Sequence, residues 1–501
     1  MASSNFFQNN KHGNSQSKKA DLFQPPGLED NIEELGETKG MRSIHELRAA
    51  GINNRFLSDM EELMNDIKDS SRAGTSRRRS AMMELCTKLF DKSFVAKFLD
   101  YGFEQILYPH LKNASDGIIG FLMAASIALI IESGAPVNAL KHVAESGCML
   151  ALKSLLDQST DISRVARDRR SNMSKVTQAS LNDLRTLLLD SPIFGAAEKQ
   201  QTITPQTMAL MSIALLTRKL QDAGYPCDML DGEMVGKLIA VAEKACKRQI
   251  ATTPMGASMG DLELVFNILE ANSLSSLSGG AMWSVTNLQQ LSALYPLILG
   301  LKMERVEQEG LNSFALRLCL NLTESKPTVC ELFSTPEIIE PWAQVVDHSC
   351  RSLASDMDEM ERETILQQVV VLLGTMINLS EHSDRARLSI LANGDQLLFR
   401  LLDSFVVGQQ RVSQADSVEE SRSNVAFGYL AVLLGNLCIN LLIRAKVQSA
   451  LPGKSLGFLI ESIEEFVSVH RSADDYFKVE SQKEVHEALT RRLQAVADRL
   501  K

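Results

Sequence analysis

The side chains that could carry out chemistry are few, and their spacing fits no catalytic site. His45-Glu46 begins like the His-Glu-x-x-His motif of a zinc protease, but the second histidine of that motif would fall at Ala49. The eight histidines are scattered without the spacing of metal ligands. The sequence therefore gives no argument for an enzyme, a metal or a cofactor.

Two stretches resemble nucleotide-binding motifs only in part. Gly232–Leu238 reads GEMVGKL, which has a Gly-Lys pair without the spacing or the Ser/Thr of a P-loop. Leu277–Gly280 reads LSGG, like the signature of transporter ATPases, but no P-loop accompanies it. We therefore interpret Leu277–Gly280 as a flexible loop.

Two arginine clusters are candidates for binding. The run Arg77–Arg79 opens a predicted helix, Arg164–Arg170 lies in a polar connection, and serines flank both. A solvated helix edge and a polar loop would explain them without a function. Contact with an acidic partner or with the backbone of DNA, tunable by phosphorylation, is the alternative that these residue types allow.

The composition is that of a globular, mainly helical chain. Of 501 residues, 45% are hydrophobic but only 5% aromatic, so the apolar residues are mostly aliphatic, and few segments alternate apolar with polar residues. The net charge of −10 leaves only local basic patches for contact with nucleic acid. The eight cysteines include no Cys-x-x-Cys pair, which predicts buried free thiols in a reducing compartment.

Two uncharged segments raise the question of a membrane span. Gly117–Ile131 has 15 residues, too few to cross a bilayer. Val425–Ile443 has 19 residues but includes Gly428, Gly435 and two asparagines. We interpret the second segment as a fully buried central helix and expect no membrane association.

The chain divides into a tail and a long helical region. The first 40 residues are rich in Asn, Ser, Gln, Lys and Glu and are typical of a disordered tail. From Met41 onward, helical periodicities follow one another, separated by polar stretches. This predicts an all-α fold over residues 41–501, with a division into two lobes, about 41–300 and 301–501, left open.

An Asn-Leu pair closes a long apolar run three times. Its asparagines are Asn321, Asn378 and Asn440, spaced 57 and 62 residues apart. After each come a polar or basic turn, a shorter amphipathic helix, a breaker and another apolar helix. The breakers are Pro336, Gly394 and Gly453. This pattern predicts a HEAT/armadillo-like solenoid, whose usual work is to hold other proteins. An asparagine near the end of a buried helix can hydrogen-bond the backbone of the neighbouring repeat.

The stretch Arg42–Ile67, RSIHELRAAGINNRFLSDMEELMNDI, resembles the start of the conserved domain of the Wings apart-like (Wapl) family, particularly its fungal members. Further matching positions continue to Leu111, and three segments of the second half are also similar to that family. Those segments are Leu316–Leu322, Met376–Arg387 and Leu430–Cys438. The resemblance is dense over residues 42–131 and 311–445.

This resemblance implies a nuclear, chromatin-associated, non-catalytic HEAT-repeat factor that releases cohesin from chromosomes. Wapl proteins act with a HEAT-repeat accessory subunit. They contact the kleisin-bound subunits and ATPase heads of cohesin and favour opening of the ring where kleisin meets one head. Many members carry Phe-Gly-Phe-type docking motifs in a long N-terminal region, whereas here that region has about 40 residues and lacks one. No cofactor is implied, and direct contact with DNA is left open.

We expect the partner-binding residues among the polar side chains of the matching motifs. The candidates are His45, Glu46, Arg48, Arg55, Arg385 and Arg387. The first four lie in the first motif, where capping and salt bridging within the first helices is the alternative role. The last two follow the second Asn-Leu pair, on a turn expected to line one face of the array. The hypothesis is that one of these sets contacts cohesin.

Two other classes of function compete with this interpretation. One is an armadillo/HEAT adapter scaffold for another complex, although only Trp283 and Trp342 occur, so the Trp ladder of an import receptor is missing. The other is a regulatory subunit of a phosphatase or ligase, or an exchange factor that acts through a helical groove. Nucleotide-exchange and ubiquitin-transfer assays would detect the second class.

Overall fold

The computed structural model describes most of the chain from Ile44 to Lys501. The gaps are residues 113–115, 195–201, 226–228, 252–259, 276–282, 302–304, 356, 413–417 and 475–479. The predicted tail, residues 1–40, and the LSGG stretch at Leu277–Gly280 lie outside the described residues. The chain forms two compact units, residues 1–63 and 64–501.

The described residues form α-helices, short 3-10 helices and no strand, so the predicted all-α class is confirmed. The helices of the first half are α1 (Ile44–Lys68), α2 (Thr75–Lys88), α3 (Lys92–Asp100), α4 (Phe103–Leu111), α5 (Gly117–Glu132), α6 (Val137–Glu145), α7 (Cys148–Leu155), α8 (Ile162–Arg167), η1 (Arg169–Ser171), α9 (Lys175–Leu189), η2 (Pro192–Phe194), α10 (Pro205–Asp222) and α11 (Gly232–Ala251). Those of the second half are α12 (Gly260–Ser275), α13 (Val285–Leu299), α14 (Arg305–Thr323), α15 (Pro327–Phe333), α16 (Pro336–Leu353), α17 (Glu359–His382), α18 (Asp384–Ser389), α19 (Gln396–Val412), α20 (Val418–Leu437), α21 (Leu441–Ala450), η4 (Pro452–Lys454), α22 (Gly457–Asp474) and α23 (Glu480–Leu500).

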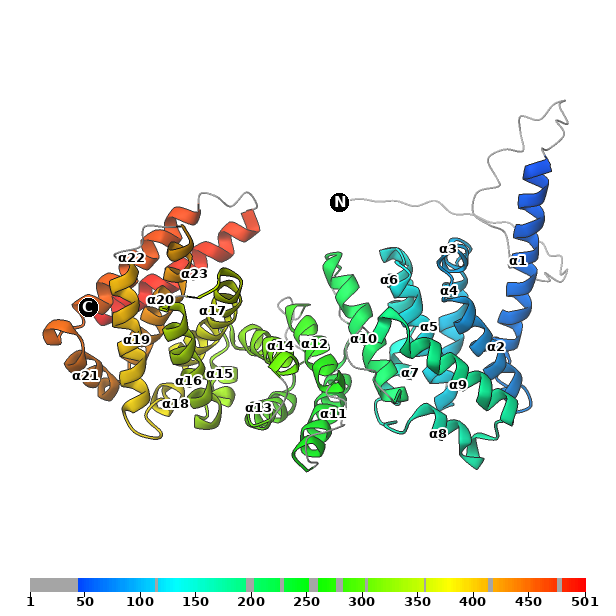
Figure 1. Ribbon diagram of the computed structural model, residues 1–501, viewed down its shortest axis with the longest axis horizontal. Coiled ribbons are helices and arrows are strands. Elements are labelled where there is room, and N and C mark those ends of the chain that lie inside the picture. The colour runs from blue at the N-terminus through cyan, green and yellow to red at the C-terminus, as the bar shows by residue number, and fades with distance from the viewer. Residues whose placement is uncertain are drawn as a thin grey trace, which may run out of the picture. The chain divides into compact units, whose positions relative to one another are not determined.

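Within the unit of residues 64–501, one row of helices forms a spine. In order of packing, the row is α2, α5, α10, α12, α14, α17 and α20, after which α22 and α23 cover α20 (Figure 1). A second row, α11, α13, α16 and α19, packs beside it. Each spine helix contacts mainly its neighbours along the row, and the second row packs on the spine, which is the architecture of a helical-repeat solenoid.

Three repeats of the second half follow the predicted order of long helix, short helix and long helix. They are α14–α15–α16, α17–α18–α19 and α20–α21–α22. The predicted breakers all fall at helix boundaries: Pro336 is the first residue of α16, while Gly394 and Gly453 have φ of +96° and +70°. Glycine adopts such positive φ without strain, so both positions let the chain turn between helices.

Side-chain amides connect successive spine helices. The Asn321 amide donates to Ser273 Oγ at 2.9 Å, and the Asn378 amide donates to the Leu320 carbonyl oxygen at 3.4 Å. In the third repeat the equivalent residue is Asn436, whose amide donates to the Ile377 carbonyl oxygen at 3.4 Å. The prediction that these asparagines bond the backbone of the neighbouring repeat is therefore confirmed for Asn378. Asn321 also bonds the neighbouring repeat, but through the side chain of Ser273.

The prediction that Asn440 is the third asparagine of this series is wrong. The segment Val425–Ile443 is not one helix, because α20 ends at Leu437 and α21 begins at Leu441. Asn440 lies in the break, where its side chain caps α21 by accepting from the backbone N–H of Leu442 at 3.1 Å. Its amide donates to Asp384 Oδ1 at 2.9 Å, so it still connects two repeats, but at the surface.

The most apolar helices lie inside the unit. From Ile118 to Ile131 every residue of α5 is buried, and the Asp116 carboxylate caps the helix by accepting from the Ile118 backbone N–H at 2.9 Å. Within the described residues, α17 alone meets the length and hydropathy expected of a membrane span, and half of its most apolar window is buried. Because α17 packs between α14 and α20, its apolar residues have partners within the spine.

The cysteine prediction is confirmed where it can be examined. Seven cysteines are free and buried: Cys86, Cys148, Cys246, Cys319, Cys330, Cys350 and Cys438. Burial raises the pKa of Cys86 and of Cys438 to about 12, so both remain protonated thiols at neutral pH. Cys227 lies outside the described residues.

Candidate partner-binding surfaces

Helix α1 carries the first candidate set. Arg48 and Arg55 are exposed, and Ile52 between them is 60% exposed. These three residues have the i, i+4, i+7 spacing of one helix stripe, so α1 presents an aliphatic side chain flanked by two guanidinium groups. His45 and Glu46 lie in the first turn of the helix, and their side chains lie outside the described residues.

The second candidate set lies on a short helix rather than on the predicted turn. Arg385 of α18 is exposed. The pKa of Glu337 is lowered by hydrogen bonds from its own backbone N–H and the Thr335 side chain, and the nearby charge of Arg385 lowers it further. Arg385 therefore stands at the surface beside one carboxylate.

Arg387 is held within the fold. Its guanidinium donates to the carbonyl oxygen of Ser380 at 2.6 Å and to Asp384 Oδ1 at 3.1 Å. The first contact occupies a carbonyl in the last turn of α17, where a helix has no intrahelical donor to offer. Arg387 thus closes the α17–α18 corner, which leaves Arg385 as the more available arginine of this pair.

The first basic cluster combines exposed and buried arginines. Arg77 is exposed, with a 3.8 Å contact to Asp66, and the Arg78 guanidinium donates to the His110 carbonyl oxygen at 3.2 Å. Arg79 is buried, and its guanidinium donates to Asp116 Oδ2 at 2.7 Å and to the Ser171 carbonyl oxygen. Arg79 therefore joins α2, the N-cap of α5 and η1, so it is neither a solvated edge nor available to a partner.

A buried carboxylate on the spine is a site that sequence reasoning missed. Glu270 of α12 is 3% exposed, and its two oxygens accept from Arg218 of α10 at 3.0 Å and from Arg317 of α14 at 3.2 Å. Both guanidinium groups lie near the Phe314 ring, at 5.9 and 4.9 Å from its centroid. The two arginines are about one-third exposed. Three spine helices therefore present a basic and aromatic surface whose arginines are held by the buried Glu270 carboxylate.

The spacing of polar residues in the sequence could have revealed the Glu270–Arg317 ion pair. The 47-residue interval between Glu270 and Arg317 nearly equals the 48-residue interval between Ser273 and Asn321. Both pairs connect α12 with α14, one helical turn apart. A second junction occurs on α17, where Glu381 Oε2 accepts from Arg492 of α23 at 2.7 Å. Ion pairs therefore connect α12 with two neighbouring spine helices and α17 with α23.

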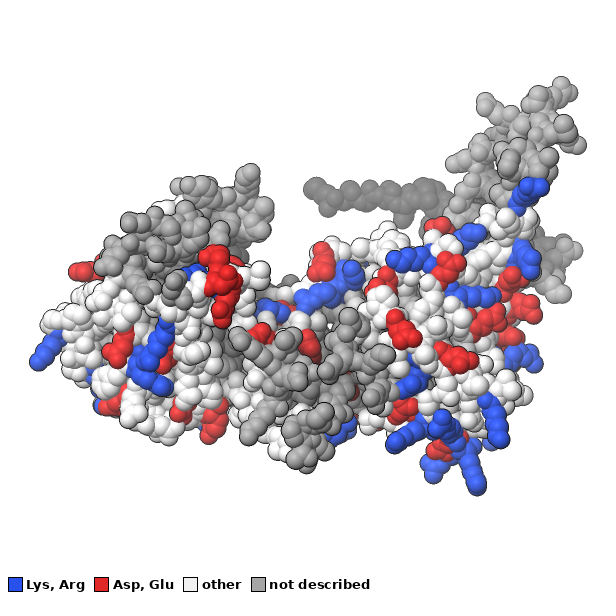
Figure 2. Space-filling model, viewed as in Figure 1, with Lys and Arg blue, Asp and Glu red and all other residues white. Residues whose placement is uncertain are grey.

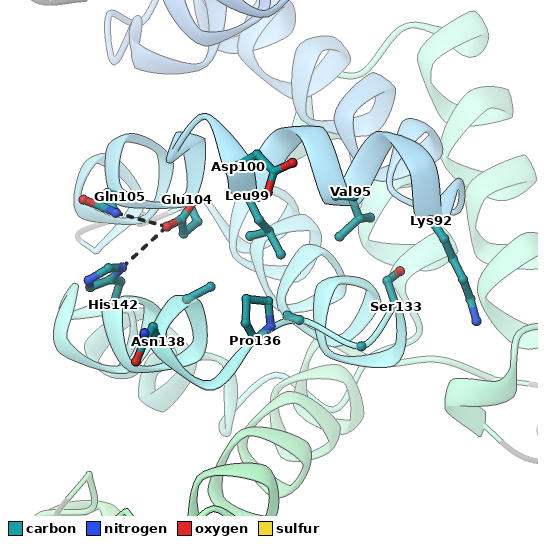
Figure 3. A pocket seen from close by; sticks show the side chains of 14 residues that line it. Lys92, Val95, Leu99, Asp100, Glu104, Gln105, Ser133, Pro136, Asn138 and His142 are labelled. Atoms are coloured by element: carbon teal, nitrogen blue, oxygen red, sulfur yellow. Dashed lines mark hydrogen bonds and ion pairs between the residues drawn. The ribbon is translucent and has the colours of Figure 1, made fainter. Parts of the chain in front are cut away.

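A pocket of about 340 Å³ opens between α3 and the turn that leads into α6. Figure 3 shows Glu104 and His142 at one end, Lys92 at the other, and Val95 and Pro136 between them. Glu104 is 3% exposed, and its Oε1 lies 3.5 Å from His142 Nδ1. Its Oε2 is buried without a hydrogen-bond partner in the described part of the chain. The pocket therefore carries both basic and acidic side chains in its lining.

The prediction that no spacing fits a catalytic site is wrong for one stretch, which lies almost entirely outside the described residues. Gly256-Ala257-Ser258-Met259-Gly260 has the spacing of the Gly-x-Ser-x-Gly nucleophile elbow, and only its last residue is described. That elbow follows a strand, whereas the preceding described element here is the helix α11. Among the residues that the structure describes, no group of three His, Cys, Asp or Glu side chains is arranged to hold a metal ion.

These features define the class of the protein: a helical-repeat scaffold with charged surfaces fixed on a stacked core. The family described as "Wings apart-like protein regulation of heterochromatin" matches residues 40–386. This match spans more than half of the chain, so the chain belongs to the Wings apart-like family, and it is a regulatory protein of the Wapl type. The matched region includes α1 and Arg385 and ends one residue before Arg387.

One solved structure agrees on the fold. The structure of the Wpl1 protein aligns over 91% of this chain and 98% of that chain, with 14% identity and a TM-score of 0.50. This likeness shows a shared helical-repeat fold. Two engineered proteins also align, over 88% and 65% of this chain, with 14% and 13% identity, over 98% of each of those chains, and with TM-scores of 0.34 and 0.32. No curated protein matches the chain.

Proposed function

We propose that this chain binds cohesin in the nucleus and promotes its release from chromatin by favouring an open ring. The observation that carries the proposal is the Arg48–Ile52–Arg55 stripe, which is exposed and lies inside the family match. Arginine is enriched among the hot spots of protein interfaces, so two exposed arginines on one helix stripe are candidates for such contacts. Residues Arg48, Arg55 and Arg385 are the proposed contacts, together with His45 and Glu46.

The mechanism is differential binding rather than catalysis by this chain. A scaffold that binds the open ring more tightly than the closed ring shifts the equilibrium by the difference in binding free energy. A tenfold shift needs only about 1.4 kcal/mol, the contribution of one or two good contacts. ATP hydrolysis is assigned to the ATPase heads of cohesin, and a HEAT-repeat accessory subunit is the proposed co-partner.

The binding test uses the full chain and purified cohesin that contains its kleisin-bound subunits. Immobilised wild-type chain is compared with R48E/R55E, and with a control, K219E/K244E, that reverses two exposed lysines elsewhere. We expect R48E/R55E to weaken binding at least tenfold, while the control binds like the wild type. Equal melting temperatures of the three proteins would assign the loss to the surface rather than to the fold.

Other outcomes would redirect the assignment. Strong loss of thermal stability in R48E/R55E would give these arginines a structural role. Undiminished binding by R48E/R55E would move the contact to another surface, for which the matching variant is R385E. Absence of any cohesin binding by the wild-type chain would contradict the proposed function and favour an adapter for a different complex.

A further inference from the structure

The second arginine cluster forms a concentrated positive surface on α8 and η1. Arg164, Arg167, Arg169 and Arg170 fall within seven residues, and all four are exposed. None of their guanidinium groups has an ion pair or a hydrogen bond within the part of the chain that the structure describes. Figure 2 shows Lys and Arg side chains crowded over α8, at the lower right of the molecule.

The backbone that carries these arginines is held firmly in place. Ile162 and Ala166 are buried, and the Ile162 backbone N–H donates to the carbonyl oxygen of Ile203 at 2.9 Å. Asp161 caps α8, and its Oδ2 lies 3.5 Å from Arg185 of α9. The buried Arg79 holds η1 from the α2 side. The four guanidinium groups are therefore attached to a rigid base.

The carboxylates nearby are already engaged, so they neutralise the cluster only in part. The single carboxylate inside it, Asp168, accepts from the backbone N–H of Arg170 at 2.9 Å and thereby caps η1. Asp161 caps α8 and forms an ion pair with Arg185. The serine hydroxyls are also used internally, because Ser163 Oγ donates to Asn182 Oδ1 at 2.6 Å and Ser171 Oγ donates to the Ala166 carbonyl oxygen at 2.7 Å.

The chemistry of the surface selects one class of ligand. Guanidinium groups bind phosphate oxygens in a two-pronged geometry, which suits a polyanion with regularly spaced phosphates. Residues 161–175 include no aromatic side chain on which a base could stack. The exposed aliphatic side chain that follows, Val176, is of a type that is under-represented among the hot spots of protein interfaces. These observations favour a duplex backbone over single-stranded nucleic acid and over an acidic protein.

We propose that Arg164, Arg167, Arg169 and Arg170 form a contact site for the phosphate backbone of double-stranded DNA. The site reads no sequence, because it offers only backbone contacts. The whole chain carries a net charge of −10, which repels DNA. We therefore expect the affinity for DNA to be modest and to depend on these four arginines. A scaffold with this site would touch the DNA as well as a protein partner, independently of whether that partner is cohesin.

The test measures fluorescence anisotropy of labelled 30-base-pair duplexes of two unrelated sequences, titrated with the full chain. If four arginines each displace one counterion, the logarithm of the association constant should fall with the logarithm of the salt concentration with a slope of about −3 to −4. The variant R167E/R169E/R170E should bind at least tenfold more weakly and with a shallower slope. The control K219E/K244E/R491E makes the same charge change at three exposed cations elsewhere and should bind like the wild type.

Each alternative result would overturn the proposal. Failure of the wild type to bind duplex at 50 mM salt would remove the site. Equal loss in the control variant would reduce the effect to net charge, and tighter binding of single-stranded DNA of the same length would exclude a duplex backbone site. A poly-glutamate peptide that binds the same arginines as tightly as the duplex would assign the surface to acidic proteins. Circular dichroism melts establish that the variant is folded.

Discussion

The Asn378 side-chain amide donates to the carbonyl oxygen of Leu320, 58 residues earlier in the chain, at 3.4 Å. The same amide lies 3.4 Å from Thr323 Oγ1, and its oxygen accepts from Arg492 at 3.0 Å. One buried asparagine thus joins α14, α17 and α23. Such contacts fix how one repeat stacks on the next, and so they fix the surfaces that several repeats build together.

Replacing Asn378 with leucine should loosen this junction. The substitution leaves Arg492 without its amide acceptor and Thr323 without a partner from α17, which we expect to cost about 1–3 kcal/mol. Hydrogen exchange should quicken in α14 and α17, because repeats unfold in local units. The contrasting variant N440A removes the cap of α21 and should quicken exchange there alone. Equal hydrogen-exchange protection of α14 and α17 in N378L and wild type would contradict the role given to the Asn378 side chain.

Replacing Arg79 with methionine should destabilise the first helices of the 64–501 unit. Arg79 is the partner of Asp116, and its removal leaves a largely buried carboxylate without its guanidinium, at a cost of about 3 kcal/mol. The melting temperature measured by circular dichroism should fall by several degrees. R77A, at the exposed neighbouring position, should leave it almost unchanged. The account of the first basic cluster is wrong if R77A is the more damaging change.

Replacing Asp261 with asparagine should stabilise the protein, by an amount that depends on pH. Burial raises the pKa of its carboxyl above 3.8, against the hydrogen bonds from Thr207 and Gln206. A carboxyl whose folded pKa is raised costs stability when ionised, at pH above the raised value, and this cost disappears below 3.8. D261N keeps an oxygen for Gln206, so it should melt higher than wild type at pH 8, and the difference should shrink as the pH falls toward 3.8. A constant or negative difference would show that the charge is not the cause.

The thiols give a test of the core as a whole. Because the seven described cysteines are buried and the pKa of several is raised by desolvation, a thiol reagent such as DTNB should label at most Cys227 in the native protein. After unfolding in denaturant, all eight cysteines should react. Rapid labelling of three or more thiols in native protein would mean that the helices open far more readily than this packing implies.

Much of the second half could be predicted from the sequence because its periodicity is local. The apolar runs, breakers and repeated Asn-Leu pairs give the three-helix repeats almost in place. The error at Asn440 arose because Asn-Leu occurs twice within five residues, at Asn436 and at Asn440, and only three-dimensional register shows which one faces α17. A spacing of 58 residues from Asn378, close to the preceding 57, was the sequence signal for Asn436.

The surfaces could be predicted less well, because exposure depends on contacts distant in sequence. Arg79 and Arg387 stand in runs that look solvent-exposed, yet each is held by partners on another element. Glu270 shows no local mark of its two arginines, which lie 52 and 47 residues away. By contrast, the Arg48 and Arg55 stripe follows from helical spacing alone, and the structure leaves both side chains exposed.

The most direct test of the central proposal is the residence time of cohesin on chromatin. A tagged cohesin subunit is followed by photobleaching in cells that have or lack this gene, and in deleted cells that re-express the wild-type chain or R48E/R55E. We predict slower recovery in the deletion, rescue by the wild-type chain and no rescue by R48E/R55E at equal expression. Unchanged recovery in the deletion would contradict cohesin release as the function of this chain.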